Sequence, residues 1–131
     1  MFTFLVILTT CILNVQIAFE QMLGKTKKDV QTMMNSHGEF ASNNFGVSTN
    51  DNTLRYYNSR KDITLMFYFD DSQKCKHVKL MEDISTFDKR VLELNQKYKR
   101  SGNNWVTNTN SKAVKIDMDK DEYNYSLNYH F

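Results

Sequence analysis

The sequence contains no proline, four glycines and two cysteines among its 131 residues. Two cysteines are too few for a disulfide scaffold. If Cys11 is removed or acylated with the apolar leader around it, Cys75 has no partner in the chain. We therefore expect Cys75 to be a small buried hydrophobe on a strand. We draw no function from the absence of proline.

Neither sign of charge dominates, since 17 Lys and Arg face 15 Asp and Glu, for a formal net charge of +2. This balance argues against a nucleic-acid-binding domain, which carries a clustered basic excess. We expect no nucleic acid among the partners.

Signatures of catalysis are also missing. The chain has no nucleophile elbow, phosphate-binding loop, dinucleotide fingerprint or zinc-protease motif. The histidines at His37, His77 and His130 have no metal-ligand spacing among themselves or with Cys75. The sequence therefore predicts no enzyme, no metal and no cofactor, although a catalytic site assembled from distant residues stays open.

The first nineteen residues carry no charged side chain, and Glu20 is the first. The apolar run is short for a membrane span and is typical of a secretory signal, although it lacks a basic start. We predict a signal peptide over residues 1–18, cleaved after the small Ala18. Two alternatives are lipidation at Cys11 and a retained anchor, the only membrane contact that we expect. The protein is predicted to be exported, either periplasmic or secreted.

A β-hairpin is predicted over residues 63–80. In residues 63–69 the large apolar side chains Ile63, Leu65, Phe67 and Phe69 alternate with Thr64, Met66 and Tyr68, the period of a strand with one buried face. Residues 70–74 supply turn chemistry, with Asp70 and Asp71 at its start. The return strand has Cys75, Val78 and Leu80 as its apolar members.

Two helices are predicted. The first spans residues 27–36, because Thr26 and Asp29 have capping-box spacing and three apolar residues then share one stripe. The second begins near Ile84. Its apolar stripe is Ile84, Phe87, Val91, Leu94 and Tyr98. Lys97, Lys99 and Arg100 are placed in its last turn, where cations favour the helix dipole, and Gly102 is placed at its end.

These elements predict a single α+β domain over residues 22–131. Its order is α-β-β-β-β-α-β-β-β, with both helices packed on one face of a largely antiparallel sheet. The predicted strands are residues 40–47, 54–57, 63–69, 75–80, 105–106, 113–118 and 123–131.

In the last strand Leu127 and four aromatic residues alternate with polar residues to the C-terminus. Such a stripe is first a core face, but a final strand is also free to lie at a sheet edge. Its aromatic residues therefore form a possible partner surface made of Tyr123, Tyr125, Tyr129 and Phe131.

The run 117–121 has the opening spacing of a calcium loop. Glu122 stands where that loop needs glycine, and Asn128 stands where it needs a closing glutamate. A charged hairpin turn is the preferred interpretation.

Part of the chain resembles a known family. Leu23-Gly24-Lys25-Thr26-Lys27-Lys28-Asp29-Val30 is similar to the glycine-led start of the first helix in SmpA/OmlA-type envelope lipoproteins, which are akin to β-lactamase-inhibitor domains. Leu65 to Asp71, followed by Lys74-Cys75, is similar to their strand and acidic turn. This likeness covers residues 23–80 and implies a role in outer-membrane assembly.

A closer likeness covers nearly the whole mature chain. Small uncharacterised secreted proteins of bacteria combine an "FLGKT" start, a "YYFD…GKC" hairpin, and a Lys-Tyr helix end followed by "NNW". The matching residues here are Met22 to Thr26, Phe67 to Asp70 with Lys74-Cys75, Lys97-Tyr98, and Asn103-Asn104-Trp105. This resemblance implies export and an architecture, but no activity.

We therefore expect a non-enzymatic exported binding or envelope-assembly module with a protein partner of unknown identity. The alternative is an inhibitor or immunity-type protein that acts on a secreted enzyme. An exposed aromatic patch would favour the first, and a protruding acidic loop such as Asp70-Asp71 the second. A polar pocket with His77 or His130 would favour a third function, a small hydrolase.

Overall fold

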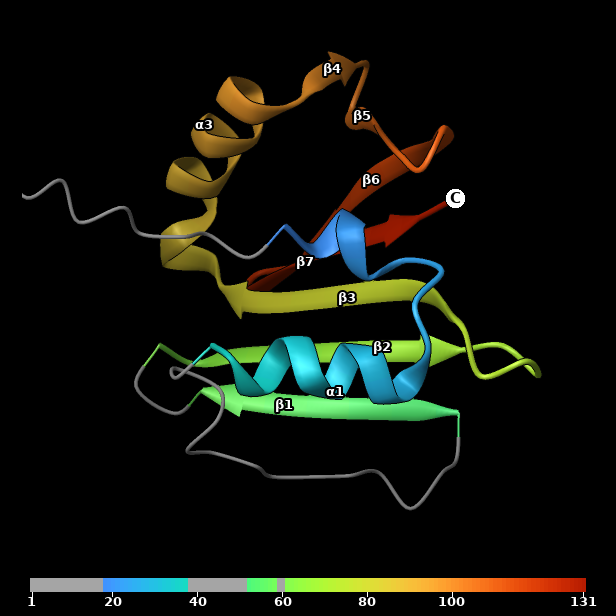
Figure 1. Cartoon of the computed structure of the whole chain (residues 1–131). Coiled ribbons are helices and arrows are strands. Elements are labelled where there is room, and N and C mark those ends of the chain that lie inside the picture. The colour runs from blue at the N-terminus through green and yellow to red at the C-terminus, as the bar shows by residue number, and fades with distance from the viewer. Residues whose placement is uncertain (1–17, 38–51, 59–60) are drawn as a thin grey trace, which may run out of the picture.

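The computed structural model describes residues 18–37, 52–58 and 61–131. In these residues seven antiparallel strands form one sheet of order β1-β2-β3-β7-β6-β5-β4 (Figure 1). The strands are β1 Thr53–Asn58, β2 Ile63–Phe69, β3 Cys75–Asp83, β4 Lys99–Ser101, β5 Asn104–Thr109, β6 Lys112–Lys120 and β7 Asn124–His130. The helices are η1 Phe19–Met22, α1 Lys27–Asn35, η2 Ile84–Thr86 and α3 Phe87–Lys97. The α+β class with an antiparallel sheet is confirmed. The expected leader up to residue 17 and the expected strand at 40–47 lie outside the described residues.

The predicted hairpin is confirmed as β2 and β3. One carboxylate oxygen of Asp70 accepts hydrogen bonds from the backbone N–H groups of Ser72 at 2.9 Å and Lys74 at 3.0 Å. Gln73 takes a positive φ of 61° at the close of the turn. Asp70 is therefore a turn residue, as its sequence context predicts.

The predicted order of elements is wrong in one respect. Three described strands precede the second helix and four follow it, because α3 ends at Lys97. Tyr98 is extended, with φ −126° and ψ 158°, and Lys99–Ser101 pairs with β5 as the edge strand β4. Gly102, with φ 61°, serves the β4–β5 turn instead of ending the helix.

Tertiary contacts explain why the helix ends early. The Tyr98 hydroxyl donates a 2.7 Å hydrogen bond to Glu20, and the Arg100 guanidinium lies 5.4 Å from the centre of the Trp105 ring. Both contacts are made by a chain that is extended after Lys97. The expectation that Lys99 and Arg100 complement a helix dipole is therefore wrong.

The last strand does not lie at an edge. β7 pairs with β3 on one side and with β6 on the other, so the edges of the described sheet are β1 and β4. Tyr125, Leu127 and Tyr129 of β7 are each at most 4% exposed. A strand that buries such a stripe is most stable at the centre of the sheet.

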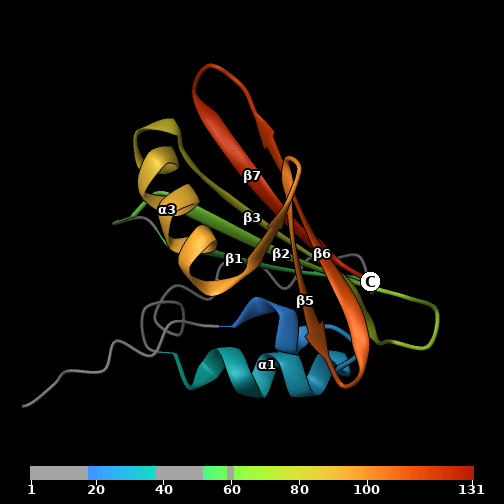
Figure 2. The same cartoon turned by 90° about the horizontal axis from the view of Figure 1, so that it is seen from above.

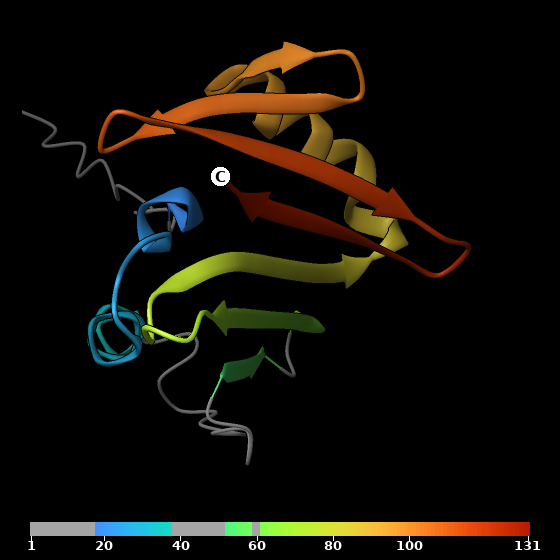
Figure 3. The same cartoon turned by 90° about the vertical axis from the view of Figure 1, so that its right-hand side faces the viewer.

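One face of the sheet carries the core. α1 adds Val30 and Met34 to it, α3 adds Leu94, and η1 packs Phe19 edge-to-face against Tyr129 at 5.7 Å. The packing of the helices differs in detail from the expected arrangement of two helices on one face of the sheet. α1 crosses the β1–β2 end, α3 stands beside the β5–β7 end, and η1 lies between them (Figures 2 and 3).

The short helix η1 is part of the core, since Phe19, Glu20 and Met22 are all at most 9% exposed. Among the described residues, no helix has the length and apolar character needed to cross a membrane.

Candidate interaction face

The four aromatic residues predicted as a partner surface do not share one exposed surface. Tyr125 is 2% exposed and packs edge-to-face against Phe87 at 5.4 Å, and Tyr129 is 4% exposed beneath η1. Tyr123 is 69% exposed and Phe131 46% exposed, but they flank opposite ends of β7. Alternation along a strand predicts a shared face, and the core uses that face here.

The face of the sheet that carries the core, which we call the covered face, also holds an ion pair between a buried carboxylate and a partly exposed arginine. Glu82 is 4% exposed and accepts from Arg90 Nε and Nη2, both at 2.7 Å. Arg90 also bonds to Glu93 on the same helix at 3.0 Å. A buried carboxylate of this kind needs its cation, because an unpaired charge in the interior is costly. We infer that this cluster holds α3 against β3.

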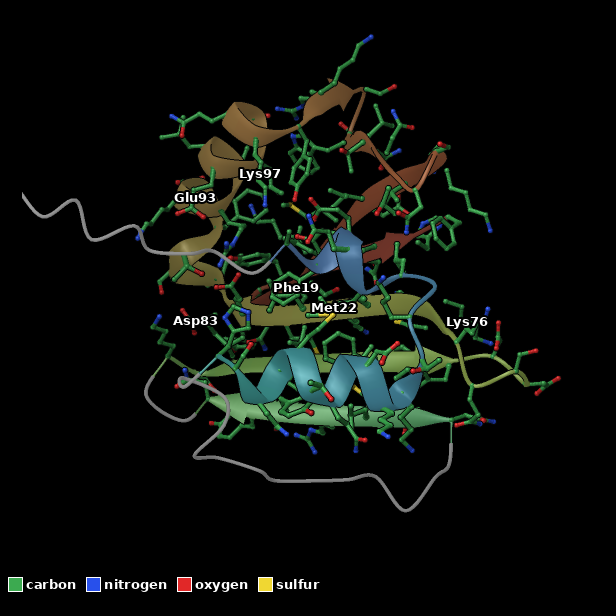
Figure 4. All side chains as sticks on the ribbon, viewed as in Figure 1. Phe19, Met22, Lys76, Asp83, Glu93 and Lys97 are labelled. Atoms are coloured by element: carbon green, nitrogen blue, oxygen red, sulfur yellow. The ribbon has the colours of Figure 1, made fainter. Side chains whose placement is uncertain are left out.

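A second buried carboxylate holds η1 in place. Glu20 accepts from the Tyr98 hydroxyl at 2.7 Å and lies 4.0 Å from Lys97 Nζ. Burial and the hydrogen bond to Glu20 raise the pKa of Tyr98 well above its ordinary value, so this hydroxyl stays a donor. Figure 4 shows Phe19 and Met22 of η1 over β3, with Glu93 and Lys97 on α3 beyond them.

The opposite side of the sheet, which we call the open face, has none of the described helices on it. Cross-strand pairing arranges its side chains in three rows across β1, β2, β3, β7 and β6. The rows are Thr53-Tyr68-His77-His130-Lys115, Arg55-Met66-Lys79-Asn128-Asp117 and Tyr57-Thr64-Met81-Ser126-Asp119. Most of these side chains are half-buried or exposed.

A β-bulge places His77 on the open face. The register shifts after Tyr68, so that Tyr68 pairs with His77 and Phe69 pairs with Cys75, leaving Lys76 between them. Without the bulge, Cys75 and His77 would point the same way. With it, Cys75 is buried and His77 faces outward. Cys75 is 1% exposed, which confirms the expected buried position, and burial raises the pKa of its thiol to about 12.

The β3–β7 pairing brings two histidines together. His77 stacks on Tyr68 with ring centres 5.0 Å apart, and His130 meets His77 edge-on at 6.3 Å. His77 Nε2 lies 2.9 Å from the Asn128 side-chain oxygen. Burial, followed by the charges of His130 and two lysines, lowers the pKa of His77. We therefore expect His77 to be neutral near pH 7.

The pKa of His130 is shifted in the opposite direction to that of His77. Its Nε2 lies 2.7 Å from Asp117 Oδ2, and this hydrogen bond raises the pKa of His130 against the effect of burial. Burial alone would raise the pKa of Asp117, but His130 and Lys115 hold it below its ordinary value. His130 and Asp117 thus form an ion pair on the open face.

The described residues offer no metal centre. They contain no group of three His, Cys, Asp or Glu side chains arranged to hold an ion. In the run with calcium-like spacing, Asp121 instead accepts from the N–H groups of Tyr123 at 2.9 Å and Asn124 at 2.7 Å. Residues 117–120 belong to β6, so the interpretation as a charged turn holds for Asp121 and is wrong for the four residues before it.

Sequence reasoning missed the open face as a candidate site. It noted that His77 and His130 would meet only if strand pairing allowed it, and the β3–β7 pairing does so. The signal that would have located His77 is the spacing of Cys75 and Val78, which breaks the alternation of the strand.

No family model, curated protein or solved structure matches this chain.

Proposed function

We propose that this chain is a non-enzymatic binding domain that acts outside the cytoplasm and engages a protein partner through its open face. The observation that carries the proposal is the face itself, since α1, η1 and α3 use the other side of the sheet. The uncharged leader before Glu20 supports export.

The composition of the open face suits a protein partner. Its first two rows combine Tyr68, Met66 and Arg55 with histidine and asparagine side chains. Aromatic residues, methionine and arginine are enriched at protein interfaces relative to other surfaces. Several of these side chains are held in place by contacts with one another, such as the stacking of Tyr68 on His77 across strands and the 3.5 Å contact of the Tyr68 hydroxyl with Met66 Sδ along β2. Ordering them on binding therefore costs little further entropy.

A capture experiment tests the proposal. The parent protein and the open-face variants Met66→Glu and Lys79→Glu are immobilised and exposed to an extract of the producing cells. We expect the parent to retain a protein that both variants lose. Leu92→Glu is the matched control, because Leu92 is 59% exposed on α3. Equal capture by all four proteins would contradict the proposal.

A second candidate function, inhibition of a secreted enzyme, is favoured by the β2–β3 turn. This turn extends past the end of the sheet in Figure 1, exposes Asp71, and is stiffened by the two hydrogen bonds to Asp70. A stiff acidic loop suits a cationic enzyme cleft. Asp71→Lys should abolish capture of an enzyme by this route and leave open-face capture unchanged.

A further inference from the structure

His77 occupies a part of the open face that helix packing does not use. It lies directly between Tyr68 on β2 and His130 on β7. Its ring is half-buried by these neighbours, so its position is fixed while one edge is still reachable. The chemistry of that edge depends on which ring nitrogen carries the proton.

The hydrogen bonds of Asn128 determine which nitrogen of the neutral His77 ring carries the proton. Asp119 is a carboxylate and only accepts, so Asn128 must direct its amide nitrogen toward it, at 3.5 Å. The amide oxygen of Asn128 then faces His77, whose Nε2 must donate at 2.9 Å. The other nitrogen, Nδ1, has no hydrogen-bond partner among the described residues. Nδ1 is therefore where His77 gains or loses its proton.

The charges that act on His77 are mainly positive. His130 faces it from β7, and Lys79 and Lys76 lie near it on its own strand. Tyr68, which faces it from β2, is uncharged. These cations oppose protonation of His77 when nothing is bound, and they attract an anion to the same place.

The acids on this side already have partners. Asp117 is bonded to His130 and lies 3.4 Å from Lys115, and Asp119 is bonded to Asn128. They hold the network in place and partly offset its charge. A carboxylate from outside would supply the negative charge that the edge of His77 lacks.

On the basis of the proposed function, we infer that His77 receives an acidic side chain of the protein partner, and that this contact takes up one proton at Nδ1. The neutral ring presents a lone pair at Nδ1 and repels a carboxylate. A proton from solvent converts Nδ1 into a donor, and the ring becomes a cation that pairs with the carboxylate. Binding of an acidic partner therefore strengthens as the pH falls through the titration range of His77.

The test uses the protein as isolated from its producing cells, with hexaglutamate as the probe and hexaglutamine as the uncharged control. The ring signals of the three histidines are followed by NMR as the pH is varied. We expect saturating hexaglutamate to raise the titration midpoint of His77 by about one unit and to leave that of His37 unchanged. By linkage, such a shift is about a tenfold gain in affinity between the neutral and the protonated state.

Variants assign the effect to one residue. His77→Phe keeps an aromatic ring against Tyr68 but has no proton to gain, so it should bind hexaglutamate equally at pH 5.5 and 7.5. His37→Phe should behave like the parent. His130→Gln should weaken binding and retain the pH dependence. The inference is overturned if hexaglutamate does not bind, if the His77 midpoint stays in place, or if His77→Phe keeps the pH dependence of the parent.

The two proposals fail in different ways. If Met66→Glu and Lys79→Glu still capture the parent's partner, the open face is not the binding surface. If these variants lose the partner while His77→Phe retains the full pH dependence of binding, the open face stands and the role of His77 is wrong.

Discussion

On the covered face, Glu82 and Glu20 are buried carboxylates bonded to Arg90 and Tyr98, whereas on the open face Asp117 remains partly accessible beside His130. The first pairs connect the sheet to α3 and η1, and their removal would leave charge in the interior. The open-face pair connects neighbouring strands and keeps its edges in contact with water. The same types of side chain therefore serve stability on one face and are free for recognition on the other.

Two adjacent residues on β2 test this difference most severely. Phe67 is fully buried on the covered face and Met66 lies on the open face. We expect Phe67→Asp to abolish cooperative folding, because it loses the burial of a large aromatic residue and places a charge in the core. Met66→Asp should keep a cooperative thermal transition. Calorimetry that shows both variants folded, or both unfolded, would remove the distinction between the faces.

The Glu82–Arg90 pair should give the next largest effect. Arg90→Met leaves Glu82 buried without its cation and should lower the free energy of unfolding by about 3 kcal/mol. The double variant Glu82→Met, Arg90→Met should recover most of the loss, because the uncompensated charge is gone. Urea unfolding of the three proteins checks this. A double variant as unstable as Arg90→Met would mean that the pair itself, and not the stranded charge, stabilises the domain.

The contact between η1 and Tyr98 should contribute less. Tyr98→Phe removes one hydrogen bond to a buried carboxylate and should cost about 1 to 3 kcal/mol. Tyr57→Phe is the control, since its hydroxyl bonds to Asp62 at the surface, and its effect should be smaller. Equal losses in urea unfolding would show that Glu20 is not held by Tyr98.

The smallest effects concern pH. The folded state raises the pKa of His130, so its contribution to stability is full below its unfolded pKa of about 6.5 and is lost as pH rises through the folded value. The folded state lowers the pKa of His77, so stability falls as pH drops below about 6.5 toward that value. His130→Gln should flatten the alkaline side of the stability profile, and His77→Gln the acidic side. Unfolding free energies measured between pH 5 and 8 test both signs, and unchanged profiles would contradict them.

Much of the fold follows from local patterns in the sequence. Neighbouring residues alone predict the alternation in β2, the Asp70 turn and the Thr26 cap. In the structure, the N–H of Asp29 donates a 3.2 Å hydrogen bond to Thr26 Oγ1. The early end of α3 was not predictable in this way, because it depends on contacts of Tyr98 with Glu20, far away in the sequence.

The candidate site was less predictable than the fold. The aromatic stripe of β7 has the same pattern whether it is core or surface, and only its central position in the sheet decides. His77 meets His130 through the β3–β7 pairing, and the bulge at Lys76 lets Cys75 point into the core while His77 faces outward. The bulge is visible in the sequence as the spacing of Cys75 and Val78, but no sequence feature indicates the pairing of strands about fifty residues apart.

Site-directed photo-crosslinking in the producing cells tests the central claim most directly. A photoreactive residue is placed at Met66 or Lys79 on the open face, and at Leu92 or Tyr123, two exposed apolar residues outside it. The account predicts that both open-face positions crosslink to one and the same protein, while Leu92 and Tyr123 do not. Crosslinks to that protein from Leu92 or Tyr123 alone would contradict it.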